Sequence, residues 1–211
     1  MPGLAASPAI FDNLTLDKDL YKIHYLKWLP PLALEESLAN YAMRMTQEIK
    51  HKNVVLLGVS FGGIIVQEMS KYIETKKVII VSSVKSHEEY PKRFALASAT
   101  GLYKLFPTSL VANFEDYKKF FLGSHLKKRA KLYEKYLSER SETYLKWSIY
   151  NVLHWEQNNT QDNVIHIHGS DDKVFPIKYI KNAITVNKGT HIMIVTKGKK
   201  ISEIIHKSLT A

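Results

Sequence analysis

Three short segments of the sequence carry side chains that could together cleave an acyl bond, and the first of them surrounds Ser60. In residues 58–63, Gly-Val-Ser-Phe-Gly-Gly, this serine has a glycine two positions away on either side. A serine hydroxyl is a poor nucleophile unless it is exposed, held still and offered a base. The flanking glycines permit a sharp strand-to-helix turn in which larger side chains would collide. We therefore predict Ser60 as a nucleophile.

The other two segments supply a carboxylate and a base. Asp171 and Asp172 both follow an apolar run that is typical of a strand. A carboxylate at the carboxyl end of a parallel strand lies at the same sheet edge as a nucleophile that follows another strand. We expect one of the two aspartates to cap the following helix. His191 comes directly after the last short strand, and its imidazole could take the serine proton while a carboxylate fixes its tautomer.

Positioning these segments requires a parallel sheet with crossover helices. Alternating or short apolar runs predict strands at 21–26, 53–57, 78–81, 164–168 and 184–186. Apolar residues at helical spacing predict helices over 34–49, 64–73 and the C-terminal segment, whose inward residues are Ile201, Ile204, Ile205 and Leu209. Residues 86–159 differ, because aromatic residues and lysines at helical spacing replace the valine and isoleucine clusters. The fold class is therefore α/β, with a helical insertion between two parts of a sheet.

The three segments together resemble the signature regions of the α/β-hydrolase superfamily, in that family's order of serine, aspartate and histidine. The resemblance implies a serine hydrolase with Ser60, Asp172 and His191 as its catalytic residues, and Asp171 as the alternative acid. It implies that the early Pro-Gly segment and the turn after the nucleophile form an oxyanion hole, from the N–H groups of Leu4 and Phe61. It also implies an α/β-hydrolase core over 1–85 and 160–211, with residues 86–159 as the cap.

The N-terminal part departs from the family, which has two antiparallel strands and a third strand before the Pro-Gly loop. This third strand normally lies between the fourth and fifth, so that its absence predicts a hole in the sheet. Either the chain begins upstream of Met1 or the sheet has closed up; the first is our expectation. Well-formed pairing between segments 21–26 and 53–57 would contradict it.

Composition excludes several other classes. The 211 residues suffice for one sizeable core, and the absence of cysteine excludes disulfides, cysteine nucleophiles and thiolate metal sites. No apolar run approaches the roughly 18 residues that span a bilayer, and the first residues lack the features of a secretory signal. We expect a cytoplasmic protein without a cofactor. The net charge of +10 comes from scattered basic residues, so nucleic acid is not an expected partner.

Three alternatives remain open. His166 and His168 occupy one face of a strand, a spacing that metal sites use. A chain of this fold could bind a small ligand without turning it over. An anionic polymer or membrane surface as partner is supported only by the charge. The leading interpretation is hydrolysis of a carboxylic ester or related acyl bond of a small molecule; substrate and oligomeric state are not predicted.

Overall fold

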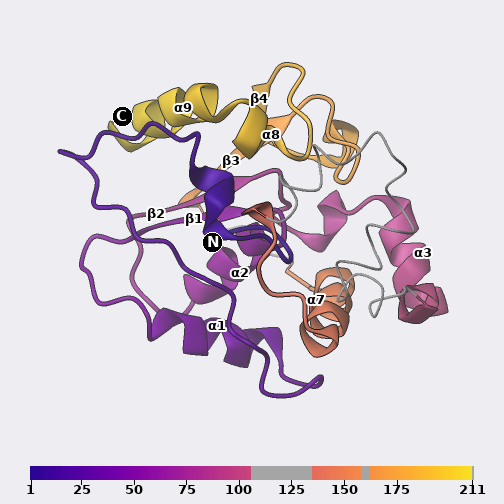
Figure 1. The fold of residues 1–211 in the computed structure, drawn as a ribbon. Coiled ribbons are helices and arrows are strands. Elements are labelled where there is room, and N and C mark those ends of the chain that lie inside the picture. Colours follow the sequence, from indigo (N-terminus) through magenta and orange to yellow (C-terminus); the bar gives the residue numbers. More distant parts are fainter. Residues whose placement is uncertain (106–134, 158–161, 211) are drawn as a thin grey trace.

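The computed structural model describes residues 1–105, 135–157 and 162–210, and its centre is a four-stranded parallel sheet (Figure 1). The strands lie in the order β1 (Val55–Val59), β2 (Lys77–Val81), β3 (Val164–Gly169) and β4 (Ile184–Val186). Each neighbouring pair is parallel. The carboxyl ends of these strands therefore meet at one edge, where the three candidate segments follow them.

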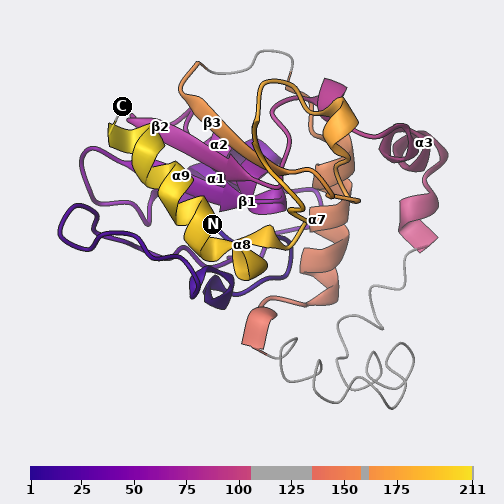
Figure 2. The same cartoon turned by 90° about the horizontal axis from the view of Figure 1, so that it is seen from above.

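Helices cover both faces of the sheet, as Figures 1 and 2 show. One face carries α1 (Leu38–Thr46), α2 (Phe61–Met69) and α7 (Glu142–His154), and the other carries α8 (Met193–Thr196) and α9 (Gly198–Thr210). Helix α3 (Lys92–Thr100) lies to one side of these layers. Short 3-10 segments cover Pro8–Phe11, His87–Glu89, Leu102–Leu105 and Ile177–Tyr179.

The strands read as continuous apolar runs because both of their faces are buried. Along β2, Val78 and Ile80 pack into the cluster beneath α1, α2 and α7, whereas Ile79 and Val81 pack into the cluster beneath α8 and α9. All four side chains are fully buried. This two-faced burial confirms the α/β class predicted from the sequence.

Helix α7 uses the wide apolar surface that its sequence presents. Trp147 lies 4.4 Å from the ring of Tyr41 on α1 and 5.9 Å from the ring of Phe61 on α2, measured between ring centroids. Helix α3, in contrast, has no buried residue. The predicted cap at 86–159 falls partly on 106–134 and 158–161, which lie outside the described residues, so its limits stay a prediction.

The predicted strand at 21–26 is wrong, because this segment pairs with no strand in the described part of the chain. Residues 21–26 and residues 53–57, at the outer edge of the sheet, both line a groove of about 530 Å³. An extended segment without a neighbouring ladder is not a strand. The pairing that would have closed the sheet is therefore not found in the described part of the chain.

Met1 occupies the end of this outer edge. Its amino group donates to the carbonyl of Leu57 at 2.6 Å, and its carbonyl accepts from the N–H of Val59 at 3.1 Å. These two bonds bracket Gly58 in the pattern of a parallel ladder. The backbone immediately before the Pro-Gly segment is thus fixed to β1.

Element boundaries moved at several ends. The predicted helix over 34–49 begins only at Leu38, because Ser37 is its N-cap and accepts from the N–H of Asn40. Strand β1 starts two residues later than predicted and runs to Val59, and α2 begins directly after Ser60.

None of the helices in the described residues combines the length and the apolar character that a membrane-spanning helix needs.

Candidate active site

Ser60 occupies the turn between β1 and α2 with a backbone conformation that side chains rarely adopt, φ 53° and ψ −121°. The turn is possible because strand and helix approach closely at the flanking glycines. A Cβ on Gly58 would overlap the carbonyl of Gly62, and one on Gly62 would overlap the carbonyl of Pro2. The sequence motif therefore encodes a strained turn that presents the serine side chain at the sheet edge.

Backbone hydrogen bonds hold the strained turn in place. The N–H of Ser60 donates to the carbonyl of Val81 at 3.0 Å, and the hydroxyl of Ser83 donates to the carbonyl of Ser60 at 2.7 Å. Both partners belong to β2 or the residues directly after it. The position of the serine is thus set by the neighbouring strand as well as by its own helix.

The structure brings together Ser60, His191 and Asp172, here called the triad. His191 Nε2 lies 2.9 Å from Ser60 Oγ, and His191 Nδ1 lies 2.9 Å from Asp172 Oδ2 and 3.2 Å from Oδ1. The three residues follow β1, β3 and β4, so they come from three carboxyl ends of one sheet. The side chain of Asp172 is fully buried, while that of His191 is 23% exposed.

The contacts define which atoms carry protons. An ionised carboxylate only accepts, so Nδ1 of His191 donates to Asp172. A neutral imidazole then has an unprotonated Nε2, which accepts the hydroxyl hydrogen of Ser60. The arrangement is therefore set for transfer of the serine proton to His191.

Asp172 stays ionised because several donors surround it. Burial alone would raise its pKa, but the hydrogen bond and charge of His191 and the N–H of Phe175 outweigh burial and hold the pKa below its ordinary value. Its Oδ1 accepts from the N–H groups of Val174 at 2.8 Å and Phe175 at 3.0 Å. The carboxylate thus closes a turn with one oxygen and faces His191 with the other.

Asp171 lies outside this arrangement. It is exposed, and its carboxylate accepts from the hydroxyl of Ser170. The expectation that one aspartate caps the following helix is wrong: Pro176 is the N-cap of the segment at Ile177–Tyr179 and makes no side-chain cap. Asp172 instead accepts from the N–H groups of Val174 and Phe175, in the turn that precedes this segment.

The segment proposed for the oxyanion hole is held against the triad. The carbonyl of Gly3 accepts from Trp28 Nε1 at 2.9 Å, and the N–H of Ala5 donates to the hydroxyl of Tyr144 at 3.2 Å. These bonds fix the backbone on both sides of Leu4. Phe61 is the first residue of α2, so its N–H has no intrahelical acceptor.

Aromatic residues that the sequence did not single out for the site lie beside the imidazole. The ring of Phe175 is 5.7 Å from His191, and Tyr90 and Phe94 lie 6.1 and 5.6 Å from Phe175, between ring centroids. Phe94 and Tyr90 were visible only as members of an aromatic-rich segment. Spacing could not reveal them, because they meet Phe175 across a long stretch of chain.

Among the described residues, His166 and His168 are not joined by a third histidine, aspartate or glutamate in a group that could hold a metal ion. Both rings are buried, and burial lowers the pKa of each. His168 Nε2 lies 2.8 Å from the carbonyl of Phe175 and 3.6 Å from Asp172 Oδ2. His168 is therefore the member of the pair that lies next to Asp172, on the buried side of this carboxylate.

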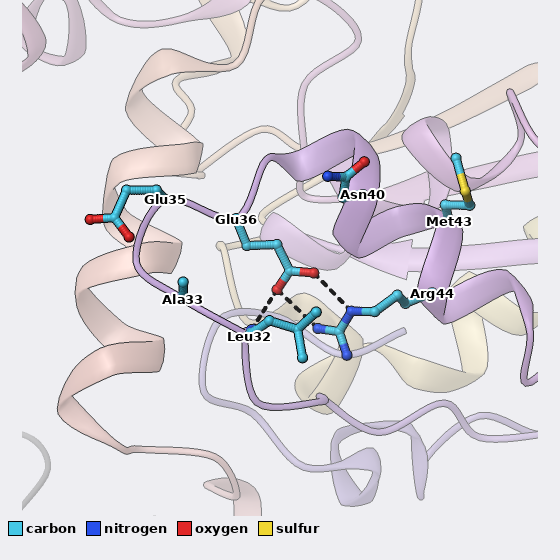
Figure 3. A pocket seen from close by; sticks show the side chains of 7 residues that line it. All are labelled: Leu32, Ala33, Glu35, Glu36, Asn40, Met43 and Arg44. Carbon is cyan, nitrogen blue, oxygen red and sulfur yellow. Dashed lines mark hydrogen bonds and ion pairs between the residues drawn. The ribbon is translucent and has the colours of Figure 1, made fainter.

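A separate hollow of about 490 Å³ lies between α1 and the loop before it (Figure 3). Glu36 binds Arg44 at 2.8 Å there and also accepts from the N–H of Leu32. No triad residue lines it. The contacts of Glu36 join the loop before α1 to the helix, and the hollow lies apart from Ser60, Asp172 and His191.

Comparison with known proteins places this geometry in a fold. The sequence matches no protein-family model and no curated protein. Among solved structures, a carboxylesterase study of Nitrososphaera gargenis provides a chain with 15% identity and a TM-score of 0.62, covering 100% of this chain and 88% of that one. A hydrolase from Pseudomonas aeruginosa PA01 has 15% identity and a TM-score of 0.61, with 87% and 75% covered. A lipase-esterase related protein from Clostridium acetobutylicum has 17% identity and a TM-score of 0.57, with 98% and 91% covered.

The chain therefore has the α/β-hydrolase fold, as the resemblance of its three motifs implied. At these identities the similarity defines the fold alone.

Proposed function

We propose that this chain is a serine hydrolase that cleaves a carboxylic ester or related acyl bond of a small molecule through an acyl-enzyme intermediate. The observation that carries the proposal is the continuous line of contacts from Ser60 Oγ through His191 to Asp172, each of 2.9 Å. The strained backbone of Ser60 supports it, because such strain persists only where the surroundings enforce it. Solved structures of the same fold include esterases and hydrolases.

In the first half-reaction, Ser60 Oγ attacks the acyl carbon while His191 Nε2 takes the hydroxyl proton. Asp172 stabilises the resulting imidazolium. The tetrahedral intermediate expels the alcohol, which receives the proton from His191 and leaves the acyl group on Ser60. In the second half, water attacks the acyl-enzyme ester and gives a proton to His191. The tetrahedral intermediate then collapses and releases the carboxylic acid, while His191 returns the proton to Ser60 Oγ.

The N–H groups of Leu4 and Phe61 are proposed to bind the oxyanion. Two backbone donors aimed at the developing negative charge lower the barrier most, because they need no reorganisation during the reaction. Helix α2 adds the positive end of its dipole at the same place. The hydrogen bonds that anchor Gly3 and Ala5 support a fixed position for the first donor.

The segment 86–159 is proposed as a cap over the core formed by 1–85 and 160–211. Its residues Tyr90 and Phe94 contact Phe175 beside His191, which supports an apolar acyl or alcohol group near the triad. A cytoplasmic location and a small-molecule acyl substrate belong to the same proposal.

Labelling with a fluorescent fluorophosphonate tests the activated serine. Wild type is expected to label, and Ser60→Ala is expected to lose the label while keeping its circular dichroism spectrum and melting temperature. Ester turnover by the variant should fall by about 10⁴-fold or more. A well-folded wild type that neither labels nor hydrolyses a panel of acyl esters would overturn the proposal and favour the ligand-binding alternative.

A further inference from the structure

A buried line of two imidazoles runs from the interior to the turn that holds Asp172. His166 Nε2 lies 3.2 Å from His168 Nδ1, and His168 Nε2 lies 2.8 Å from the carbonyl of Phe175. Both rings are at most 2% exposed. A buried polar side chain needs its hydrogen bonds, so these contacts define how the rings are protonated.

The proton of His168 must be on Nε2. An unprotonated Nε2 would place its lone pair against the carbonyl oxygen of Phe175 and near Asp172 Oδ2, which is 3.6 Å away. With Nε2 protonated, Nδ1 of the neutral ring is an acceptor. The N–H of His166 Nε2 lies 3.1 Å from the carbonyl of Ser83 and 3.2 Å from this Nδ1, and is shared between the two acceptors. His166 is thus compatible with the tautomer in which His168 donates to the turn, and the carbonyl of Phe175 selects that tautomer.

The turn that His168 binds is the one that Asp172 closes. The carbonyl of Phe175 receives His168, while the N–H of Phe175 donates to Asp172 Oδ1 at 3.0 Å. The two bonds use the C=O and the N–H of the same residue, Phe175. Because His168 belongs to β3, they connect the carboxylate of Asp172 to this strand. Movement of the Phe175 carbonyl would therefore shift the oxygen that faces His191.

We propose that His168 is a positioning residue for Asp172: by donating to the Phe175 carbonyl, it holds the carboxylate at hydrogen-bond distance from His191. This inference rests on the proposed function, since it assigns a role within the same site. His168 contacts no substrate and exchanges no proton in the reaction. Its hydrogen bond acts on Asp172 through the 172–175 turn, and its Nε2 also faces Asp172 Oδ2 at 3.6 Å.

The charged and titratable groups around the two rings are few in the described part of the chain. Asp172 and His191 face His168, while Glu89 and Lys85 lie on the side of His166. Glu89 Oε2 lies 4.0 Å from His166 Nδ1, an atom without a hydrogen-bond partner there. Burial keeps the pKa of His166 well below its ordinary value, so this ring is neutral. The N–H of His168 Nε2 points toward the turn that holds Asp172.

Three variants test the role. His168→Leu removes the donor at similar size, and His168→Gln keeps an N–H near the position of Nε2. Ile167→Val is the matched control, because this neighbouring side chain on β3 is fully buried and its loss of a methylene weakens packing without touching the turn. Each variant is first checked for folding by its melting temperature.

With an ester that wild type turns over, His168→Leu is expected to lower kcat by roughly 10- to 100-fold with KM changed less than about threefold, as a misplaced catalytic group does. His168→Gln should recover kcat to within about threefold of wild type. The low-field proton NMR signal of the His191–Asp172 hydrogen bond should be lost in His168→Leu and retained in Ile167→Val.

The result separates this inference from the function on which it rests. A wild type that fails to label with fluorophosphonate overturns the hydrolase proposal itself. A wild type that labels, with a His168→Leu kcat no lower than that of Ile167→Val, overturns the positioning role. A kcat deficit that His168→Gln does not relieve also contradicts it, because the deficit would then not come from the donor.

Discussion

Asp172 and Asp171 are adjacent carboxylates in different surroundings, and this difference makes the catalytic acid testable. In Asp172→Asn, the amide would offer an N–H to His191 Nδ1 and reverse the imidazole tautomer, so Nε2 could no longer accept the Ser60 proton. We expect kcat to fall by about 10⁴-fold with the fold intact. Ester hydrolysis at saturating substrate measures it.

Asp171→Asn is the matched control for that measurement. The Asp171 side chain is exposed and binds only the neighbouring Ser170 hydroxyl among the contacts found. Its substitution should leave kcat within about threefold of wild type. The reverse order, with Asp171→Asn inactive and Asp172→Asn active, would reassign the acid.

At the residue scale, residue type and position after predicted strands sufficed to propose Ser60, His191 and one of two adjacent aspartates, because parallel strands bring their carboxyl ends to one edge. The choice between Asp171 and Asp172 came from the family resemblance, and the structure places only Asp172 against His191. His168 was weighed as a metal ligand because strand alternation shows which side chains share a face. It cannot show that one ring meets a carbonyl seven residues later.

The β1–α2 turn depends on two glycines for space, and this requirement belongs to the scale of the elements. A Cβ at Gly58 would overlap the Gly62 carbonyl, and backbone cannot give way as a flexible side chain can. Gly58→Ala is therefore expected to lower the free energy of unfolding by about 3 kcal/mol or more, or to prevent folding. Urea denaturation followed by tryptophan fluorescence measures it.

Gly101→Ala provides the comparison for that substitution. Gly101 has φ 68°, so alanine there is strained, but among the described residues its Cβ would meet only the Lys104 side chain, at 3.9 Å. The expected cost is about 1 kcal/mol. Equal costs at the two positions would show that the close approach of strand and helix is not what requires Gly58.

Among the elements, the buried strands and the C-terminal helix were predictable because their periodicity reports burial directly. Strand β4 lies where its apolar run predicts it, and α9 buries Ile201 and Ile205 as expected. The strand at 21–26 was not predictable in the same way. Its alternation matches a strand, but a strand also needs a neighbour, and the neighbouring position beside β1 is a groove.

At the scale of the whole molecule, Met1 lies at the edge of the sheet that β1 leaves without a neighbouring strand in the described part of the chain. Met1 is buried, and its ammonium donates to the β1 carbonyl of Leu57 at the end of the groove along this edge. Burial lowers its pKa from 8.0 to about 5. The amino group of Met1 therefore binds a proton more weakly in the folded chain than in the unfolded chain.

This difference predicts a pH dependence of stability. Between pH 8 and pH 5 the unfolded chain binds more protons than the folded chain at this group, so the free energy of unfolding falls as pH falls. The limit is three pH units at about 1.4 kcal/mol each; because the unfolded group is half protonated at pH 8 and the folded group at pH 5, the loss from Met1 alone over this interval is about 3 kcal/mol. The measurement uses protein that retains Met1, as checked by intact mass. Its free energy of unfolding is determined by urea denaturation at pH 8 and at pH 5.

Nα-acetylated chain is the matched control, because acetylation removes the charge but keeps an N–H that can donate to Leu57. Its stability should depend less on pH, by about 3 kcal/mol over the same interval, since the contributions of the buried histidines cancel in the comparison. Equal pH dependence in the two forms would mean that the ammonium is solvated in the folded chain. The ladder bonds that bracket Gly58 would then not hold Met1 against the sheet, and the adjacent segment at Leu4, proposed for the oxyanion hole, would lose one of its anchors.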